Sequence, residues 1–286
     1  MQKLLPDRLK NLWKDVEAKK ATTEEFEVQQ EKWFQEYRAI WKKAMLLDGQ
    51  TELGNSLLVE LGQHVGCSDL VEVRRRCAEA SKGVASEWDE IVNPGDRDSV
   101  ERFYNQSVAE IYGLLWWHAL EDDHSPLAYV AALEFAKDHG CKSYLDFGSG
   151  VGSGAVLFAR HGFSVACADI STPLLDFCRF RQSIRGINGQ FFDLKTTGLP
   201  RESYDMITAM DVFEHLFDPV TAITQLWEAL KPGGFIYGRF HAEEGDERAG
   251  HIVSTFAPTF ERMRELKLVE VWRDEWVWGH VVLQKQ

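Results

Sequence analysis

The sequence predicts an α/β fold in which a mostly parallel sheet of seven strands follows an all-helical part. From residue 126 to residue 286, short apolar runs alternate with helical segments, the order that builds a parallel sheet with right-handed crossovers. The last two apolar runs, 268–272 and 277–283, lie close enough to form a hairpin, so the last strand is expected to be antiparallel. Throughout residues 1–125, apolar residues recur at helical spacing. We therefore expect two domains, 1–125 and 126–286.

Composition narrows the class of partner. The chain has 286 residues and a formal net charge of -13, which argues against nucleic acid as the main partner, because phosphate binding relies on basic surface. No apolar run reaches the roughly 18 residues of a membrane span. The five cysteines include no C-x-x-C pair and are expected to be reduced thiols. These features predict a cytoplasmic protein that neither binds nor crosses a membrane.

The first 125 residues are predicted as consecutive helices. Thr22 and Glu25 have the spacing of a capping box that opens the second helix. Ser68 is the expected cap of a later helix, and residues 93–95 (Asn-Pro-Gly) form the clearest break. After that break, one long helix is expected to carry the apolar positions between 100 and 115.

The remaining residues alternate between helices and strands. A helix begins at the Ser-Pro pair 125–126 and ends near Gly140. Later helices are expected after the Ser-Thr-Pro sequence at 171–173, after the Asp-Pro pair at 218–219, and over 258–266. The strands expected between these helices and at the end of the chain are 144–147, 165–168, 190–192, 204–210, 235–240, 268–272 and 277–283.

A glycine-rich turn follows the first strand, in the sequence SYLDFGSGVGSGAVLFARHGFSVACADI. Glycines stand at alternate positions, so the backbone can turn tightly and approach a ligand, while the amides at the start of the next helix face it. Asp169 ends the second strand, where a carboxylate can accept hydrogen bonds from both ribose hydroxyls of a nucleotide. The turn predicts a nucleotide-like ligand.

Two classes of ligand use such a turn. The dinucleotide pattern G-x-G-x-x-G/A fails when it is counted from Gly148 but fits Gly150, Gly152 and Ala155, so the glycines alone leave NAD open. Asp146 stands two residues before Gly148 and completes the pattern D-x-G-x-G-x-G. That pattern resembles motif I of the class I S-adenosylmethionine (SAM) methyltransferases.

Later motifs extend the resemblance. The sequence D-V-F-E-H-L at 211–216, the D-P pair at 218–219 and L-K-P-G-G at 230–234 are similar to the small-molecule branch of that family, near the ubiquinone-pathway O-methyltransferases. The resemblance covers roughly the C-terminal half and implies a Rossmann-like sheet of seven strands with an antiparallel last strand. It also implies methyl transfer from SAM, with S-adenosylhomocysteine (SAH) as the product.

The same resemblance implies a set of cofactor contacts. Asp169 would bind the ribose hydroxyls and Asp193 the adenine amino group, although Asp193 and Asp211 could instead cap the turns that follow their strands. Because open α/β sheets bind ligands at successive strand ends, we favour the cofactor assignment. The implied contacts are Asp146, Gly148, Gly150, Gly152, Asp169, Ile170, Phe192, Asp193, Met210 and Asp211.

Catalysis leaves several choices open. A base is needed if the acceptor is a hydroxyl or an activated carbon, and histidine is the usual residue near neutral pH. His215 and His251 are the candidates, but His215 has a structural alternative, in which it braces the following helix, and the reaction needs no base if the acceptor is a neutral amine. The acceptor-pocket candidates are Tyr104, Trp117, His118 and His241.

No metal is expected. Residues 121–124 (Glu-Asp-Asp-His) are adjacent rather than spaced to converge on one ion. The sequence therefore favours a SAM-dependent methyltransferase for a small molecule, with the helical part as a lid, acceptor selector or homodimer surface. The alternatives are an NAD-dependent oxidoreductase and a SAM-binding regulatory subunit without catalysis.

Overall fold

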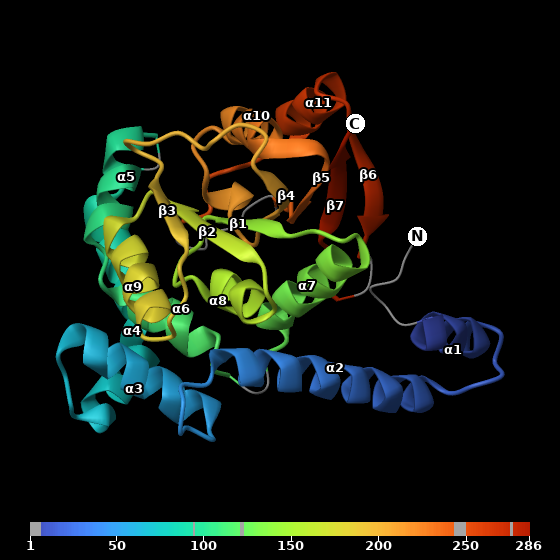
Figure 1. Ribbon diagram of the computed structural model, residues 1–286, viewed down its shortest axis with the longest axis horizontal. Helices are drawn as coiled ribbons and strands as arrows, with labels where there is room; N and C mark the ends of the chain where they lie inside the picture. The colour runs from blue at the N-terminus through green and yellow to red at the C-terminus, as the bar shows by residue number, and fades with distance from the viewer. Residues whose placement is uncertain (1–6, 94, 121–122, 243–249, 275–276) are drawn as a thin grey trace.

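The computed structural model describes residues 7–93, 95–120, 123–242, 250–274 and 277–286. At its centre is one seven-stranded sheet in the order β3-β2-β1-β4-β5-β7-β6 (Figure 1). The strands are β1 Ser143–Phe147, β2 Ser164–Asp169, β3 Gln190–Asp193, β4 Tyr204–Ala209, β5 Leu230–Gly238, β6 Leu268–Arg273 and β7 Val281–Lys285.

Helices cover the sheet and form the N-terminal part. Figure 1 shows the long helix α2 along the outer side of α7 and α8, with α10 and α11 across the sheet from them. The N-terminal helices are α1 Asp7–Glu17, α2 Thr23–Met45, α3 Leu53–Val65, α4 Leu70–Ile91, α5 Arg97–Gln106 and α6 Ala109–Trp117. The later ones are η1 Ser125–Leu127, α7 Ala128–Asp138, α8 Ser153–Arg160, α9 Thr172–Ser183, η2 Phe213–His215, α10 Pro219–Ala229 and α11 Ala257–Glu265.

The strand directions confirm the predicted sheet. Strands β1 to β5 are mutually parallel, so their carboxyl ends meet at one edge. Strand β7 is antiparallel to both β5 and β6, because the β6–β7 hairpin reverses the chain. Val281 pairs with Gly238, which brings the start of β7 to the edge where β5 ends. This order differs from the all-parallel dinucleotide-binding sheet.

Two predictions in the helical part are wrong. The helix expected to run through 100–115 is two helices, α5 and α6, because Ser107 adopts an extended backbone (φ -64°, ψ 111°). The Ser107 hydroxyl accepts a hydrogen bond from the Glu110 amide, which favours a new helix start over continuation. The cap of α4 is Asp69 rather than Ser68, because the Asp69 carboxylate accepts hydrogen bonds from the first free backbone amides of that helix.

One hydrophobic cluster joins the helical part to the sheet. It contains Trp41 and Leu61 from the N-terminal helices together with Tyr144 and Cys167 from β1 and β2. The predicted division after residue 125 stays a prediction, since this cluster includes residues from both sides of it. Among the described residues, no helix combines the length and apolar composition that crossing a bilayer requires.

Candidate functional site

A cavity of about 470 Å³ lies along the carboxyl ends of the parallel strands. Its floor is formed by the residues that follow β1, β2, β4 and β5 and by the residues that precede β7. Helix α6, from the N-terminal part, supplies a wall through Glu110, Leu114 and Trp117, which are spaced to share one face. Open α/β sheets bind ligands at this edge, so the cavity is the candidate site.

The glycine loop shapes the cavity as the sequence predicts. Gly148 and Gly150 both line the cavity and have positive φ angles of 65° and 51°. A Cβ atom on Gly148 would lie 2.5 Å from Val212 Cγ2, and one on Gly150 would lie 3.2 Å from Leu114 Cδ1. Gly152 (φ 70°) is packed outside the cavity, where a Cβ atom would lie 2.7 Å from Cys178 Sγ. Side chains at these positions would clash or strain the backbone.

Asp169 ends β2 and lines the cavity while remaining 7% exposed. Its Oδ2 accepts a hydrogen bond from the Gly150 amide, and its Oδ1 accepts one from the Ser171 amide, each at 2.9 Å. Burial raises the pKa of this carboxyl above its usual value, although the backbone hydrogen bonds oppose the shift. Each oxygen keeps a second lone pair, so the group can hold the loop and a ligand hydroxyl together.

Asp146 lies beneath the glycine loop and is fully buried, outside the cavity lining. Its oxygens accept hydrogen bonds from the Ala155 amide at 3.2 Å and the Thr208 hydroxyl at 3.0 Å. Burial raises its pKa to about 7, against the lowering effect of those hydrogen bonds. The structure therefore gives Asp146 the position of a brace between β1, β4 and α8.

The two residues predicted beside adenine, Phe192 and Asp193, are half-buried and lie outside the cavity lining. Ile170, another predicted cofactor contact, lines the cavity. Burial tends to raise the pKa of Asp193, but hydrogen bonds from Lys195 and Thr172 outweigh it and hold the pKa below its usual value. The adenine role of Asp193 stays a prediction.

Met210 and Asp211 both line the cavity after β4. Asp211 has a positive φ of 49°, a left-handed conformation that aspartate adopts more readily than most residues other than glycine. Its Oδ1 lies 3.2 Å from the Nε of Arg239, which follows β5. This ion pair links two neighbouring strand ends within the cavity.

The two predicted base candidates meet in the structure. His215 and His251 both line the cavity, and their rings lie edge to face with centroids 4.8 Å apart. His215 Nδ1 forms a 2.9 Å hydrogen bond with the Gly250 carbonyl, so it is also braced. Within the described chain, Glu214, His215 and His251 bring ligand atoms within 4.8 Å of one another, a spacing that could hold a metal ion.

Three of the four acceptor-pocket candidates line the cavity, namely Tyr104, Trp117 and His118. His241 is exposed and lies outside the lining. His118 is 7% exposed, and burial, with help from the charge of Arg181, lowers its pKa to about 3. It is therefore a neutral hydrogen-bonding residue rather than a base.

The run at 121–124 is engaged in packing at its described end, while Glu121 and Asp122 lie outside the described residues. Asp123 accepts hydrogen bonds from the Trp117 indole at 2.5 Å and the Ser125 amide at 2.8 Å. His124 stacks on Phe34 with centroids 4.0 Å apart. These contacts bind the loop to the helical part.

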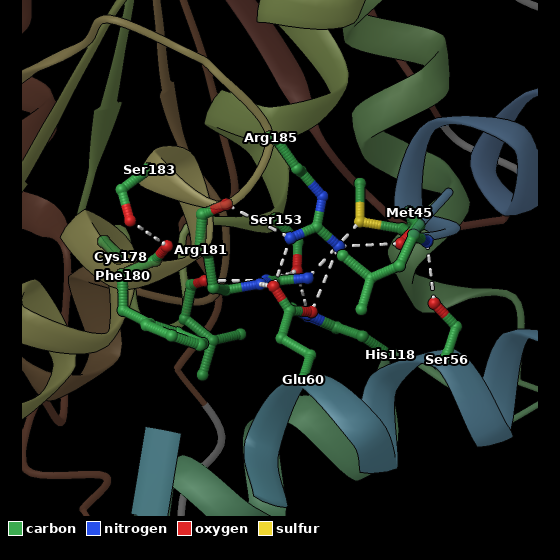
Figure 2. A network of polar contacts seen from close by, with 12 residues as sticks. Met45, Ser56, Glu60, His118, Ser153, Cys178, Phe180, Arg181, Ser183 and Arg185 are labelled. Atoms are coloured by element: carbon green, nitrogen blue, oxygen red, sulfur yellow. Dashed lines mark hydrogen bonds and ion pairs between the residues drawn. The ribbon is translucent and has the colours of Figure 1, made fainter. Parts of the chain in front are cut away.

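A buried ionic network ties the helical part to the glycine loop. Figure 2 shows Glu60 of α3 facing the guanidinium groups of Arg181, on α9, and of Arg185, in the turn that follows α9. Arg181 Nη1 donates to the Val151 carbonyl at 2.7 Å and to the Ser153 hydroxyl at 2.9 Å. The Ser153 hydroxyl in turn forms a 2.9 Å hydrogen bond with His118 (Figure 2). The network therefore runs from α3 to the wall of the cavity.

Several residues that line the cavity were not predicted from the sequence. Arg239 could have been found, because it follows β5 and the strand-end rule applies to it. His280 falls within the strand expected at 277–283, but β7 begins at Val281, so His280 precedes the strand at the edge where β5 ends. Glu110 and Leu114 carried no sequence signal, since their place depends on how α6 docks.

Comparisons with known proteins match part of the chain to methyltransferases. The family model described as "Methyltransferase domain" matches residues 145–238. A ubiquinone biosynthesis O-methyltransferase of Coxiella burnetii is 33% identical over 98 residues, which make up 34% of this chain and 42% of that protein. Its counterpart from Photorhabdus laumondii is 27% identical over 154 residues, 51% of this chain and 61% of that protein. The chain thus spans about half the length of these curated relatives.

Solved structures also match. The crystal structure of a SAM-dependent methyltransferase from Aquifex aeolicus is 16% identical, covers 57% of this chain and 93% of that chain, and has a TM-score of 0.44.

Proposed function

We propose that this chain, whose residues 145–238 match a methyltransferase domain, is a class I SAM-dependent enzyme that transfers a methyl group from SAM to a small-molecule acceptor. The observation that carries the proposal is the joint placement of Asp169 and the glycine loop. The Asp169 carboxylate accepts a hydrogen bond from the Gly150 amide and lines the same cavity, so one group orders the loop and faces the space where a ligand would bind.

The residues present fit SAM as the methyl donor. A Cβ atom on Gly148 would collide with Val212, so this position requires glycine, and the backbone of Gly148 and Gly150 lines the cavity. Asp169 would hold the ribose hydroxyls, and Gly148, Gly150 and Met210 would line the methionine end. When bound, SAM supplies the activated methyl group, and the protein supplies alignment and exclusion of water.

Proton transfer from the acceptor has two candidate sites. His215 and His251 stand together in the cavity lining, within reach of an acceptor held near the end of β4. A hydroxyl acceptor would transfer its proton to one of these imidazoles, whereas a neutral amine would lose its proton to solvent after methylation. Substitution of each histidine by asparagine separates the two cases, because only the first requires an imidazole.

Calorimetric titration with SAM, SAH and NAD tests the cofactor. We expect micromolar affinity for SAM and SAH and none for NAD. Binding of NAD alone would refute the proposal, because the glycine pattern would then be read from Gly150 as a dinucleotide site. Release of SAH from SAM in the presence of small acceptors then tests turnover, and binding without turnover of any acceptor would favour a regulatory role.

A further inference from the structure

A second polar group lines the cavity beyond the proposed cofactor contacts, at the β4, β5 and β7 end. Arg239 follows β5 and His280 precedes β7, and they are neighbours because Gly238 pairs with Val281. Glu214, in the turn after β4, lines the same end. In the sheet order β2-β1-β4-β5-β7, this end lies away from Asp169 on β2. The group therefore faces a part of the cavity that the ribose site leaves open.

His280 is buried, and its imidazole has no hydrogen bonds within the part of the chain that the structure describes. The residue is 3% exposed, and neither ring nitrogen has a hydrogen-bond partner among the described residues. The ring stacks on Tyr237 with centroids 5.2 Å apart, which fixes its plane. Buried polar groups are nearly always hydrogen-bonded. A ligand in the cavity could provide the hydrogen bond that this imidazole lacks.

The protonation state of His280 defines what that ligand must offer. Burial, followed by the nearby charge of Arg239, lowers the pKa of His280 to about 3. The ring is therefore neutral, with one nitrogen that donates and one that accepts. A hydroxyl group can form a hydrogen bond with either nitrogen, because it both donates and accepts hydrogen bonds.

The neighbouring side chains are also short of hydrogen bonds. Glu214 is 2% exposed, and neither carboxylate oxygen accepts a hydrogen bond within the described chain, although Oε1 lies 3.5 Å from Arg239 Nη2. Arg239 Nε is buried without a hydrogen bond, at 3.2 Å from Asp211 Oδ1. With two carboxylates beside one guanidinium, this end disfavours an anionic ligand and suits a neutral one.

The wall beside His280 is preformed. Trp278 lines the cavity, and its indole donates to the His124 carbonyl at 2.9 Å. Its ring lies 5.8 Å from that of Trp33 on α2, so the turn before β7 is docked on the helical part. A site whose side chains are already fixed loses little conformational entropy when a ligand binds.

We propose that His280, supported by Arg239 and Glu214, contacts the methyl acceptor and selects acceptors that present a neutral hydroxyl at the β5–β7 end. This inference rests on the proposed function, since it assigns the acceptor subsite of the same cavity. His280 acts as a hydrogen-bonding residue there, and the base candidates remain His215 and His251.

Phenol and benzene form a matched pair of probes, because they differ by one hydroxyl. We would measure their dissociation constants by NMR titration of the SAH-loaded protein and of His280→Phe, which keeps a planar ring but removes both nitrogens. Wild-type protein is expected to favour phenol by about twofold to tenfold, the range that one net hydrogen bond gives. His280→Phe is expected to bring the ratio near one while benzene affinity stays the same.

Further variants make the outcome decisive. His280→Gln keeps a donor and an acceptor and is expected to restore the preference for phenol, and His280→Leu replaces His280→Phe if that variant does not fold. His161→Phe changes an exposed histidine outside the cavity and should keep the wild-type ratio. An equal ratio in wild-type protein and the apolar variants, or no binding of phenol, overturns the inference. Failure of SAH to bind would instead refute the proposed function, and the probes can still be titrated without it.

Discussion

Replacing Asp169 with alanine tests the cofactor site at its best-defined residue. The carboxylate is 7% exposed and accepts the amides of Gly150 and Ser171, each at 2.9 Å. It also lines the cavity, where we propose that it binds the ribose hydroxyls. We expect Asp169→Ala to weaken SAM binding and to lower stability, because one group serves both the ligand and the loop.

The magnitudes follow from the bonds that are lost. Each of the two amides loses its acceptor, and an unsatisfied buried donor costs about 1–3 kcal/mol. The free energy of unfolding should therefore fall by about 2–6 kcal/mol. Loss of the ribose hydrogen bonds should cost binding a further 1–3 kcal/mol or so, which corresponds to roughly a 5- to 150-fold rise in the dissociation constant.

Urea unfolding and calorimetric titration with SAM separate the two effects. Asp205→Ala is the matched control, since Asp205 also accepts two backbone amides, from Lys142 and Ser143, each at 2.9 Å. Asp205 lies near the start of β4, at the opposite edge of the sheet, so its loss should lower stability and leave SAM affinity unchanged. Wild-type SAM affinity in Asp169→Ala, or equal weakening in both variants, would refute the ribose assignment.

Three further predictions concern the buried network, the glycine loop and the wall of the cavity. Glu60→Gln should lower the free energy of unfolding, measured in urea, by about 3–5 kcal/mol, because it leaves buried arginines without their counter-charge. Glu72→Gln, at a surface ion pair, should change that free energy little. Equal effects of the two variants would show that the buried network stabilises the fold no more than a surface pair does. Gly148→Ala should weaken SAM binding at least about tenfold, because its Cβ would lie 2.5 Å from a side-chain methyl group. Gly162 has a similar φ but open space around it, so Gly162→Ala should lower the free energy of unfolding by about 1–2 kcal/mol and leave SAM affinity unchanged. Burial raises the pKa of Glu110 to about 8, so its native state holds a proton that the unfolded chain releases above its ordinary pKa of 4.5. Stability contributed by that neutral carboxyl is full below pH 4.5 and is lost as the pH rises to 8, at about 1.4 kcal/mol per pH unit at most. Glu110→Gln should remove this loss, and parallel melting curves of variant and wild type from pH 5 to pH 9 would contradict the assignment.

Local signals in the sequence predicted local structure well. The capping box at Thr22 and Glu25 is confirmed, with both reciprocal hydrogen bonds present at 3.1 and 2.8 Å, because capping depends only on residues three apart. The helix expected through 100–115 is wrong because Ser107 interrupts it, and apolar periodicity cannot register one extended residue between two helical turns. The closing hairpin is confirmed because its two strands are near neighbours in the chain.

The candidate site was predictable where a motif, a strand end or a place in the chain indicated it, as Gly148, Asp169 and Trp117 show. Asp169 ends a parallel strand, Met210 and Asp211 follow another, and all three line the cavity. Glu110 and His280 line it as well, but the position of Glu110 depends on how a helix docks and that of His280 on where β7 begins. The docking of α6 depends on residues far from it in the chain, and the apolar pattern alone did not show that β7 begins at Val281 rather than at residue 277.

The helical part reaches the two ends of the cavity by different routes, and this separates its possible effects. Through Glu60, Arg181 and Ser153 it acts on the glycine loop, where the cofactor is proposed to bind. Through Trp33 and Trp278 it acts on the turn before β7, beside the proposed acceptor subsite. A change in the ionic network should therefore alter SAM affinity first, whereas a change in the tryptophan contact should alter acceptor preference first. The helices thus form part of the site itself, because each end of the cavity rests on a contact that they provide.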